Sequence, residues 1–290
     1  MKTCSYSCVY CQLGKTRSRT IMRVEYCKPS EVLNVVLNAL SRAKKVDYVT
    51  FVGDGEPTLC YGIGQAARLI AKECSDVKLA LISNSSIIWR RDVVEDALNF
   101  DFVSMKLDAA TPTLFKLVNR PHEALRLEAI VSGLTHLSRE SSSILAIETV
   151  LVKDLNDGLW HADALAEVLR VIEPDVVYLN APIRPPAEEW VEVPPLERIE
   201  EFAKRVEKYL GRGKVVPLPL HELSELLEAT DPLTQIVEVA KLHPLPLDLA
   251  LGALKRVLGE DRAKHALAKL VSEGRVRVVK YRGREYIRAF

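Results

Sequence analysis

The chain alternates short, continuous apolar runs with longer segments in which apolar residues recur at helical spacing. Val46–Val52, with the sequence VDYVTFV, is rich in β-branched and aromatic residues and predicts a buried strand. Pro29–Ala43 begins with proline and repeats apolar residues at helical spacing from Val32 to Leu40, which predicts an amphipathic helix. The first part of the chain therefore indicates mixed α and β structure.

Further segments repeat this alternation. Buried strands are expected at Val77–Ser83, Phe100–Leu107, Ile144–Val152 and Asp175–Asn180, with a short one at Lys214–Val216. Helices are expected at Gly62–Cys74, Arg91–Asn99, Glu123–Ser138, His161–Ile172 and Leu196–Tyr209. Strands that alternate with helices form a parallel sheet, because each helix carries the chain back to the same end. Strands that are apolar throughout are covered on both faces. Two α/β architectures remain open at this stage, a barrel and an open doubly wound sheet.

The composition changes after Asn180. Ile183–Pro195 is proline-rich and predicts an extended excursion, and residues 217–230 have no clear pattern. Three helical segments and a hairpin then follow, at Pro232–Leu242, Leu247–Leu258, Glu260–Ser272 and Arg275–Phe290. Three helices followed by a hairpin is the order of a winged-helix domain. We therefore expect a first domain at 1–210, a linker at 211–230 and a winged-helix-like domain at 231–290.

Composition narrows the class of protein. With 48% hydrophobic and 27% charged residues, the 290-residue chain is typical of an ordinary globular protein with room for a large and a small domain. A net charge of +1 means that any contact with nucleic acid has to come from a local patch. The chain contains no signal peptide and no apolar run near the roughly 18–20 residues of a membrane helix. We therefore expect a cytoplasmic protein that does not contact a membrane, with reduced cysteines.

Three of the six cysteines crowd into the segment Cys4-Ser-Tyr-Ser-Cys8-Val-Tyr10-Cys11. Three thiols this close together lie on one short loop and can bind one metal cluster. A [4Fe–4S] cluster usually takes four cysteines, so three ligands leave one iron with an open position where a small molecule can bind.

The alternative for these cysteines is a structural zinc site. Such a site requires four ligands. The first histidine of the chain is His122, and Cys27 would be a fourth ligand at an awkward distance. The remaining cysteines, Cys60 and Cys74, are scattered, and we expect Cys60 to be a packed small hydrophobe. The pattern therefore favours an iron–sulfur cluster over zinc.

The cysteine segment resembles the signature of the radical S-adenosylmethionine (SAM) superfamily, Cys-x3-Cys-x2-Cys with an aromatic residue, Tyr10, before the last cysteine. Gly53-Asp54-Gly55-Glu56-Pro57-Thr58 resembles the Gly-Gly-Glu motif of that superfamily, with Asp54 where the first glycine usually stands. Other stretches are similar to a subgroup of Fe–S oxidoreductases grouped loosely with wyosine-type tRNA-modifying enzymes. These stretches are Cys11-Gln-Leu-Gly, Phe51–Leu59, Asn119-Arg-Pro-His122 and Arg184–Trp190, and the resemblance covers roughly residues 1–195.

The resemblance implies a partial (β/α)6 barrel with SAM across the carboxyl ends of its strands, where barrel enzymes place their sites. Cys4, Cys8 and Cys11 would hold a [4Fe–4S] cluster whose open iron binds the amino and carboxylate groups of SAM. One electron from a low-potential donor of the ferredoxin or flavodoxin type would cleave SAM to a 5′-deoxyadenosyl radical. The cysteine loop of the family follows the first barrel strand, whereas only three residues precede Cys4. We therefore expect the barrel to lack its first strand, through truncation or an internal start methionine.

The same resemblance suggests cofactor-binding residues. Tyr10 would contact the adenine, and Glu56 would receive the amino group of SAM; the alternatives are loop packing for Tyr10 and a solvated carboxylate for Glu56. Other candidates line the motif or the strand ends, namely Gly53, Asp54, Gly55, Asn84, Ser104, Lys106 and Asp108. Glu148 lies within an apolar strand and needs a partner, for which Lys106 or Lys153 would serve. No residue is assigned to catalysis.

The last segment, Arg275–Phe290, carries six basic residues against one acid, Glu285. A basic wing of this kind binds nucleic-acid phosphates, but winged helices also serve protein contacts. The subgroup favours tRNA over duplex DNA as the partner.

Three functional hypotheses follow. The first is a radical SAM enzyme that modifies tRNA. The second is a radical SAM activase or an enzyme acting on a protein or small molecule, and the third is a non-catalytic Fe–S or zinc protein that binds nucleic acid. The sequence contains no second cysteine triplet, so an auxiliary cluster is not expected.

Overall fold

The computed structural model describes residues 2–43, 45–217, 232–242 and 244–289. The chain divides into two compact units. Unit 1 comprises Met1–Val9, Thr16–Ala181 and Glu192–Leu218, and unit 2 comprises Tyr10–Lys15, Pro182–Val191 and Pro219–Phe290. Each unit is therefore built from segments that are distant in the sequence.

Unit 1 is built on a parallel sheet. Its strands are β1 (Tyr48–Phe51), β2 (Lys78–Ser83), β3 (Phe102–Lys106), β4 (Ile144–Val150), β5 (Val176–Asn180) and β6 (Val215–Pro217). Their order in the sheet is their order in the sequence, and every neighbouring pair is parallel. The carboxyl ends of all six strands therefore lie at one edge of the sheet. A doubly wound sheet reverses its strand order at a switch point, and this sheet does not, which leaves the barrel-type winding.

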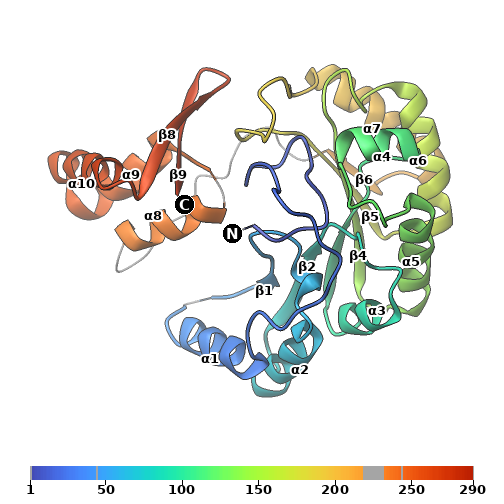
Figure 1. The fold of residues 1–290 in the computed structure, drawn as a ribbon, viewed down its shortest axis with the longest axis horizontal. Helices are drawn as coiled ribbons and strands as arrows, with labels where there is room; N and C mark the ends of the chain where they lie inside the picture. The colour runs from blue at the N-terminus through green and yellow to red at the C-terminus, as the bar shows by residue number, and fades with distance from the viewer. Residues whose placement is uncertain (1, 44, 218–231, 243, 290) are drawn as a thin grey trace. The chain divides into compact units, whose positions relative to one another are not determined.

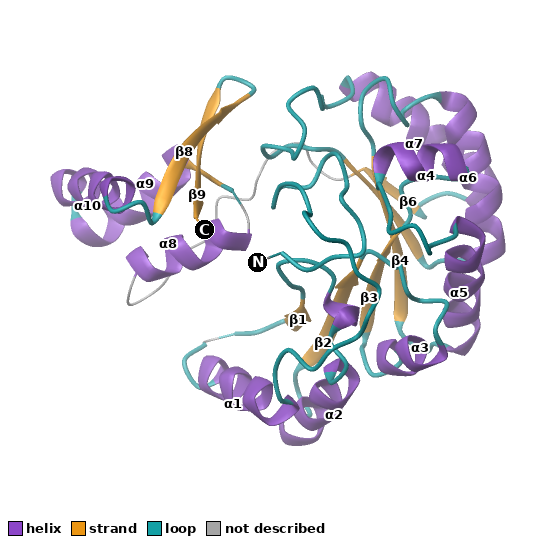
Figure 2. Cartoon of the chain, viewed as in Figure 1, coloured by secondary structure: helices purple, strands orange, loops and turns teal. Residues whose placement is uncertain are grey.

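Helices cover the outside of this curved sheet, as Figures 1 and 2 show. They are α1 (Pro29–Leu40), α2 (Ile63–Glu73), α3 (Arg91–Ala97), α5 (Leu127–Glu140), α6 (Leu159–Ile172) and α7 (Leu196–Leu210). Two short elements, η1 (Pro57–Leu59) and α4 (Pro112–Val118), were not expected from the pattern. Helix α4 begins where the Thr111 hydroxyl accepts a hydrogen bond from the Leu114 amide at 3.3 Å, a local start signal that needs no long periodic run.

The predicted strands are present, and those at the centre of the sheet are buried as expected. The prediction is wrong for β1, which was also expected to be buried but contains no buried residue, because it forms the edge of the sheet. Residues on both faces of the central strands are almost fully buried, including Leu79 and Leu81 of β2 with Ala80 between them, and Ala146 and Ile147 of β4. Side chains of successive strand residues point to opposite faces, so this burial requires cover on both sides of the sheet. In the part of the chain that the structure describes, no regular strand precedes β1; the cysteine segment instead makes isolated bridges.

Unit 2 contains a small α and β fold. Its elements are α8 (Pro232–Leu242), β7 (Leu245–Pro246), α9 (Leu247–Leu258), α10 (Glu260–Ser272), β8 (Val276–Tyr281) and β9 (Arg284–Ala289). The three strands form an antiparallel sheet in the order β7-β9-β8. Helices and sheet enclose a core that includes Ile236, Leu254, Leu267 and Ile287.

The three predicted helices and the hairpin of unit 2 are present, and only the two-residue strand β7 was not expected. Arg282 and Gly283 both have positive φ, 50° and 74°, as a tight two-residue hairpin turn requires. The expected linker at 211–230 lies mostly outside the described residues, so the domain boundaries remain a prediction. Among the helices that the structure describes, none has the length and apolar character that crossing a bilayer demands.

Close packing of α5 gives a test of the fold. A Cβ atom at Gly133 would lie 2.6 Å from the carbonyl oxygen of Ile88, so Gly133→Ala forces the helix or the loop to move. We expect this substitution to destabilise the protein by about 1–3 kcal/mol, the usual cost of overpacking. The measurement is the urea or thermal unfolding midpoint.

The control is Gly252→Ala in α9, where a Cβ atom would meet nothing within 4 Å. Because alanine favours the helix more than glycine does, this control should stabilise by about 0.5–1 kcal/mol. An unfolding midpoint of Gly133→Ala equal to that of the parent protein would contradict the close approach.

Candidate functional site

The first two cysteines lie on a segment that is fixed by backbone hydrogen bonds. The amide of Ser7 donates to the carbonyl of Asn119 at 3.0 Å, and the amide of His122 donates to the carbonyl of Ser5 at 2.8 Å. The motif Asn119-Arg-Pro-His122 therefore pairs with the cysteine segment over a distance of more than one hundred residues in the sequence. This pairing gives the motif a structural role that its sequence did not reveal.

Two asparagine side chains contact the cysteine sulfurs. Asn84 Nδ2 donates to Cys4 Sγ at 3.3 Å, and Asn119 Nδ2 donates to Cys8 Sγ at 3.5 Å. Hydrogen bonds to the sulfurs are among the factors that set the properties of iron–sulfur clusters. Asn84 was expected near the cofactor, whereas the contact of Asn119 with Cys8 was missed.

Cys4 and Cys8 are buried in unit 1, and Cys11 is partly exposed in unit 2, together with Tyr10. Among the described residues, no group of three or more histidine, cysteine or acidic side chains is arranged to hold a metal ion. The three-cysteine ligand set therefore stays a prediction from the sequence.

Glu56 is buried and accepts hydrogen bonds through both of its oxygens. Oε1 accepts from the Thr58 amide at 3.0 Å and from Ser83 Oγ at 2.7 Å, and Oε2 accepts from the Asn84 amide at 2.7 Å. Burial raises the pKa of Glu56, while these hydrogen bonds act in the opposite direction. The alternative of a solvated carboxylate is wrong, because the side chain is only 5% exposed and ties the turn after β1 to the end of β2.

The two glycines of the motif differ in their surroundings. A Cβ atom at Gly55 would lie 1.6 Å from the carbonyl oxygen of Thr3, which also accepts a hydrogen bond from the Glu56 amide at 3.0 Å. Gly55 therefore permits a close approach of backbone to backbone. At Gly53 the nearest atom to an added Cβ lies 3.9 Å away, so that position has room for a side chain.

A cavity of about 410 Å³ lies beside this motif. Asp54 and the neighbouring motif residues line it together with the end of β1 and with residues of α1 and α2. Cys27 and Cys60 also line it, and burial together with the neighbouring Cys60 thiol raises the pKa of Cys27. Cys60 is thus partly exposed at a cavity wall, in contrast to the packed position expected from the sequence.

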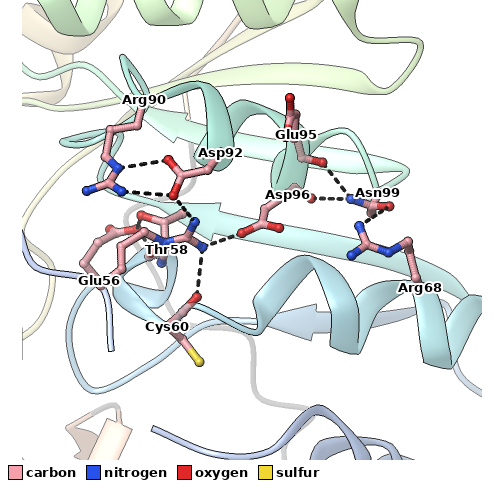
Figure 3. Close-up of polar contacts among 10 residues, drawn as sticks. Glu56, Thr58, Cys60, Arg68, Arg90, Asp92, Glu95, Asp96 and Asn99 are labelled. Atoms are coloured by element: carbon pink, nitrogen blue, oxygen red, sulfur yellow. Dashed lines mark hydrogen bonds and ion pairs between the residues drawn. The ribbon is translucent and has the colours of Figure 1, made fainter. Parts of the chain in front are cut away.

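Arg23 fixes the turn that follows Glu56. Its guanidinium, almost fully buried, donates to the carbonyls of Thr58 at 2.9 Å and Cys60 at 3.0 Å and forms ion pairs with Asp92 and Asp96. Figure 3 shows how these two carboxylates of α3 face the turn at Thr58 and Cys60. Hydrogen bonds from Arg90 and then from Arg23 lower the pKa of Asp92 to about 2. No pattern in the sequence indicated this network, because Arg23 and Asp96 are 73 positions apart.

The polar residues at the ends of β3 and β4 form an ion pair. Lys106 and Glu148 are opposite each other in the sheet register, and Lys106 Nζ lies 3.0 Å from Glu148 Oε1. Asn180 Nδ2 donates to the same oxygen at 3.0 Å. Burial alone would raise the pKa of Glu148, but the Lys106 charge and the Asn180 hydrogen bond outweigh it and lower that pKa. Of the two expected partners, Lys106 is therefore correct, and Lys153 pairs with Glu192 instead.

Asp108 lies deeper than its position at a strand end suggested. Its Oδ2 accepts from Asn119 Nδ2 at 2.6 Å and its Oδ1 from the Val150 amide at 2.7 Å, and the residue is 2% exposed. Ser104 is likewise buried on β3. Asp108 therefore orients the asparagine that contacts Cys8, in addition to the cofactor role expected from the sequence.

The buried ion pair generates a stability prediction. Glu148→Gln leaves the Lys106 ammonium without its carboxylate, so we expect a loss of about 3–5 kcal/mol in the free energy of unfolding. Because the pKa of Glu148 is lowered from 4.5 in the folded state, its contribution is present above about pH 4.5 and is lost as the pH falls through the folded value. Chemical denaturation at several pH values should show that the difference in free energy of unfolding between the parent protein and the variant decreases at acidic pH.

The matched control is Glu192→Gln, which breaks the solvent-exposed pair with Lys153 and should leave the unfolding midpoint unchanged. If both variants unfold alike at neutral pH, the Lys106–Glu148 pair is not the stabilising contact that its burial indicates.

Comparisons with known proteins agree with this arrangement. The family model of the radical SAM superfamily matches residues 1–165. The UPF0026 protein MJ1312 of Methanocaldococcus jannaschii is 32% identical over 98% of this chain and 88% of its own length. A probable dual-specificity RNA methyltransferase RlmN of Thermotoga maritima is 25% identical over 69% of this chain and 58% of its own length.

Solved structures share the fold at low sequence identity. A radical SAM methyltransferase from Sphaerobacter thermophilus superposes with a TM-score of 0.58 at 19% identity, over 74% of this chain and 63% of that protein. SuiB of Streptococcus suis bound to S-adenosylmethionine gives a TM-score of 0.56 at 12% identity, over 83% of this chain and 55% of that protein. The chain therefore belongs to the radical SAM superfamily and is an enzyme of that class, with a [4Fe–4S] cluster and SAM as its cofactors.

Proposed function

We propose that Cys4, Cys8 and Cys11 hold the [4Fe–4S] cluster and that the enzyme cleaves SAM reductively in order to modify an RNA, specifically tRNA. The observation that carries the proposal is the fixed cysteine segment, in which side-chain amides donate to the sulfurs of Cys4 and Cys8. Thiolates are the usual ligands of iron–sulfur clusters, and neutral N–H donors suit a thiolate without replacing it as a ligand. The residues present therefore fit the cofactor.

When bound, the cluster supplies an open iron for SAM and accepts one electron from a low-potential donor of the ferredoxin or flavodoxin type. The protein's own residues then bind and orient SAM. Lys106, at the carboxyl end of β3, carries the charge that attracts the SAM carboxylate, and Ser104 lies on the same face of the strand. Tyr10 is the candidate for the adenine, and the backbone of Gly53, Asp54 and Gly55 lines the neighbouring cavity.

Glu56 and Asp108 act as positioning residues in this proposal. Both accept hydrogen bonds inside the protein, and both fix an asparagine that contacts a cysteine sulfur. The motif implies that Glu56 also binds the amino group of SAM. In that role its carboxylate would remain hydrogen-bonded to Thr58, Ser83 and Asn84.

The C-terminal part of the chain supports RNA as the substrate. The element order of unit 2 is consistent with a winged helix, in which α10 is the recognition helix and β8–β9 is the wing. The exposed charges balance when α10 is taken together with its C-cap residue, Glu273: Glu260, Asp261 and Glu273 stand against Arg262, Lys264 and Lys269. The hairpin and its approach expose Arg275, Arg277, Lys280 and Arg282.

This distribution favours phosphate contacts by the hairpin. A helix cannot enter the deep, narrow major groove of A-form RNA, whereas basic side chains on a protruding hairpin reach its phosphates. The name of the RlmN relative describes an RNA methyltransferase, which agrees with an RNA target. We also propose a cytoplasmic location, where tRNA and low-potential donors are present.

The first test concerns the cluster. Anaerobic reconstitution should give about four irons per chain, and SAM with dithionite should then yield 5′-deoxyadenosine. Alanine substitution of Cys4, Cys8 or Cys11 should abolish both iron binding and 5′-deoxyadenosine formation, because each substitution removes one of the three cluster ligands.

The matched controls are Cys27→Ala, Cys60→Ala and Cys74→Ala, which should retain the iron and the cleavage activity. A protein that carries a complete cluster and produces no 5′-deoxyadenosine would overturn the proposed chemistry. Iron content that depends on Cys27 or Cys60 would overturn the ligand assignment alone.

The second test concerns the RNA. The triple variant Arg275→Gln/Lys280→Gln/Arg282→Gln should bind bulk tRNA more weakly at every salt concentration. Because each lost phosphate contact removes about 0.7–0.9 from the slope of log K against log salt, the slope should fall by roughly 2–3. Filter binding or fluorescence anisotropy measures it.

The matched control replaces three basic residues of α10, as Arg262→Gln/Lys264→Gln/Lys269→Gln, and should leave the slope unchanged. Binding of the parent protein that is independent of salt would contradict phosphate recognition and favour a protein or small-molecule substrate. If the slope falls only in the α10 variant, the phosphate contacts are made by the helix and not by the hairpin.

A further inference from the structure

Cys11 belongs to the same compact unit as the C-terminal hairpin. Unit 2 unites Tyr10–Lys15, Pro182–Val191 and the elements from α8 to β9. Within it, Arg184 Nη1 donates to Gln12 Oε1 at 3.0 Å, and Lys15 pairs with Glu188 at 2.9 Å. The turn that carries Cys11 is therefore tied to the segment at 182–191.

The same segment is also tied to the hairpin. Tyr281 donates its hydroxyl proton to the carbonyl of Pro182 at 2.7 Å, and Tyr286 donates to the carbonyl of Ile183 at 3.1 Å. These two tyrosines lie on the face of the β8–β9 sheet that carries Arg277 and Arg288, whereas the opposite face packs on the helices of unit 2. One face of the hairpin thus meets the segment that anchors the cysteine turn.

Arg288 reaches the cysteine turn directly. The amide of Gly14 donates to the carbonyl of Cys11 at 2.9 Å and closes the turn, and Gly14 has φ +82°. A Cβ atom at Gly14 would lie 3.1 Å from Arg288 Nη2. The guanidinium therefore lies against the backbone of the turn that begins at Cys11.

The position of Arg288 is electrostatically unfavourable on its own. Arg277 stands directly opposite Arg288 in the register of β8 and β9, and like charges in that arrangement destabilise a sheet. Burial and the charge of Arg277 both lower the pKa of Arg288, whereas the neighbouring Cys11 acts in the opposite direction. Two cations on one sheet face are stabilised where an anionic group lies beside them.

We propose that Arg288 sets the reduction potential of the cluster by placing a positive charge beside its ligand Cys11. The inference rests on the proposed ligation of the cluster by Cys11. Reduction transfers one electron from a low-potential donor to the cluster, with no bond made or broken, and makes the cluster more negative by one charge. A cation close to one ligand stabilises that reduced state and raises the potential.

This assignment gives the C-terminal unit a second task beside RNA contact. Arg288 comes from the last strand of the chain, and Cys11 comes from the first segment. Electron entry into the cluster would therefore depend on a residue of the C-terminal sheet. Arg288 acts through Cys11 and is accordingly a positioning residue.

The test is an anaerobic redox titration of the reconstituted full-length enzyme, with the reduced cluster followed by electron paramagnetic resonance. Arg288→Gln should lower the midpoint potential by about 59 mV. For a one-electron couple, this shift corresponds to an about tenfold lower ratio of reduced to oxidised cluster at a fixed potential. Arg288→Lys keeps the charge and should restore most of the potential. Arg256→Gln, at an exposed arginine of α9, should leave it unchanged.

Iron content and 5′-deoxyadenosine formation with excess dithionite are measured on the same samples. They separate a failure of the cluster assignment from a failure of the role of Arg288. An unchanged potential in Arg288→Gln with a complete cluster overturns the inference. If Arg288→Gln does not load iron, Arg277→Gln is measured in its place. Because Arg277 is the neighbouring cation, its loss should lower the midpoint potential by a smaller amount. An unchanged midpoint potential in Arg277→Gln would then overturn the inference.

Discussion

Two buried carboxylates at the carboxyl edge of the sheet organise the surroundings of the cysteine segment. A buried ionised carboxylate is costly unless its oxygens accept hydrogen bonds. Glu56 accepts from the Asn84 amide and Asp108 from the Asn119 side chain, and each asparagine in turn donates to a cysteine sulfur. The hydrogen bonds that the two buried carboxylates require therefore also hold the two asparagine side chains that donate to the cysteine sulfurs. Arg23 supports the Glu56 side of this arrangement by holding the following turn to α3.

Charge is distributed unevenly within the C-terminal unit. Helix α10 and its C-cap residue Glu273 together expose balanced charges, while the hairpin exposes basic residues and directs Arg288 toward the turn of Cys11. In the proposed function, the hairpin would contact RNA phosphates through its exposed residues and would influence the cluster ligand Cys11 through its packed face. The basic charge of a nearly neutral chain is concentrated in the segment to which both proposed roles are assigned.

The elements that the sequence predicted well are those whose signal is local. The five longer strands were found because most of their residues are apolar. The predicted bounds of helices α9 and α10 match the observed ones, because apolar periodicity covers their full length. Helix α4, η1 and β7 were missed because each is too short for periodicity to develop. The choice between a barrel and a doubly wound sheet was also out of reach, since strand order is a long-range property that local pattern does not encode.

For the site, residue types and their spacing were sufficient to identify the class of chemistry. The spacing of Cys4, Cys8 and Cys11 with Tyr10, and the motif ending in Glu56, indicated a radical SAM enzyme, and the family comparison confirmed it. The contacts of these side chains became known only from the folded chain: Glu148 pairs with Lys106 and not with Lys153, Glu56 is buried, and Asn119 contacts Cys8. The physical reason is that residue type and spacing fix which bonds a side chain can make, whereas packing over long sequence separations fixes which bonds it does make.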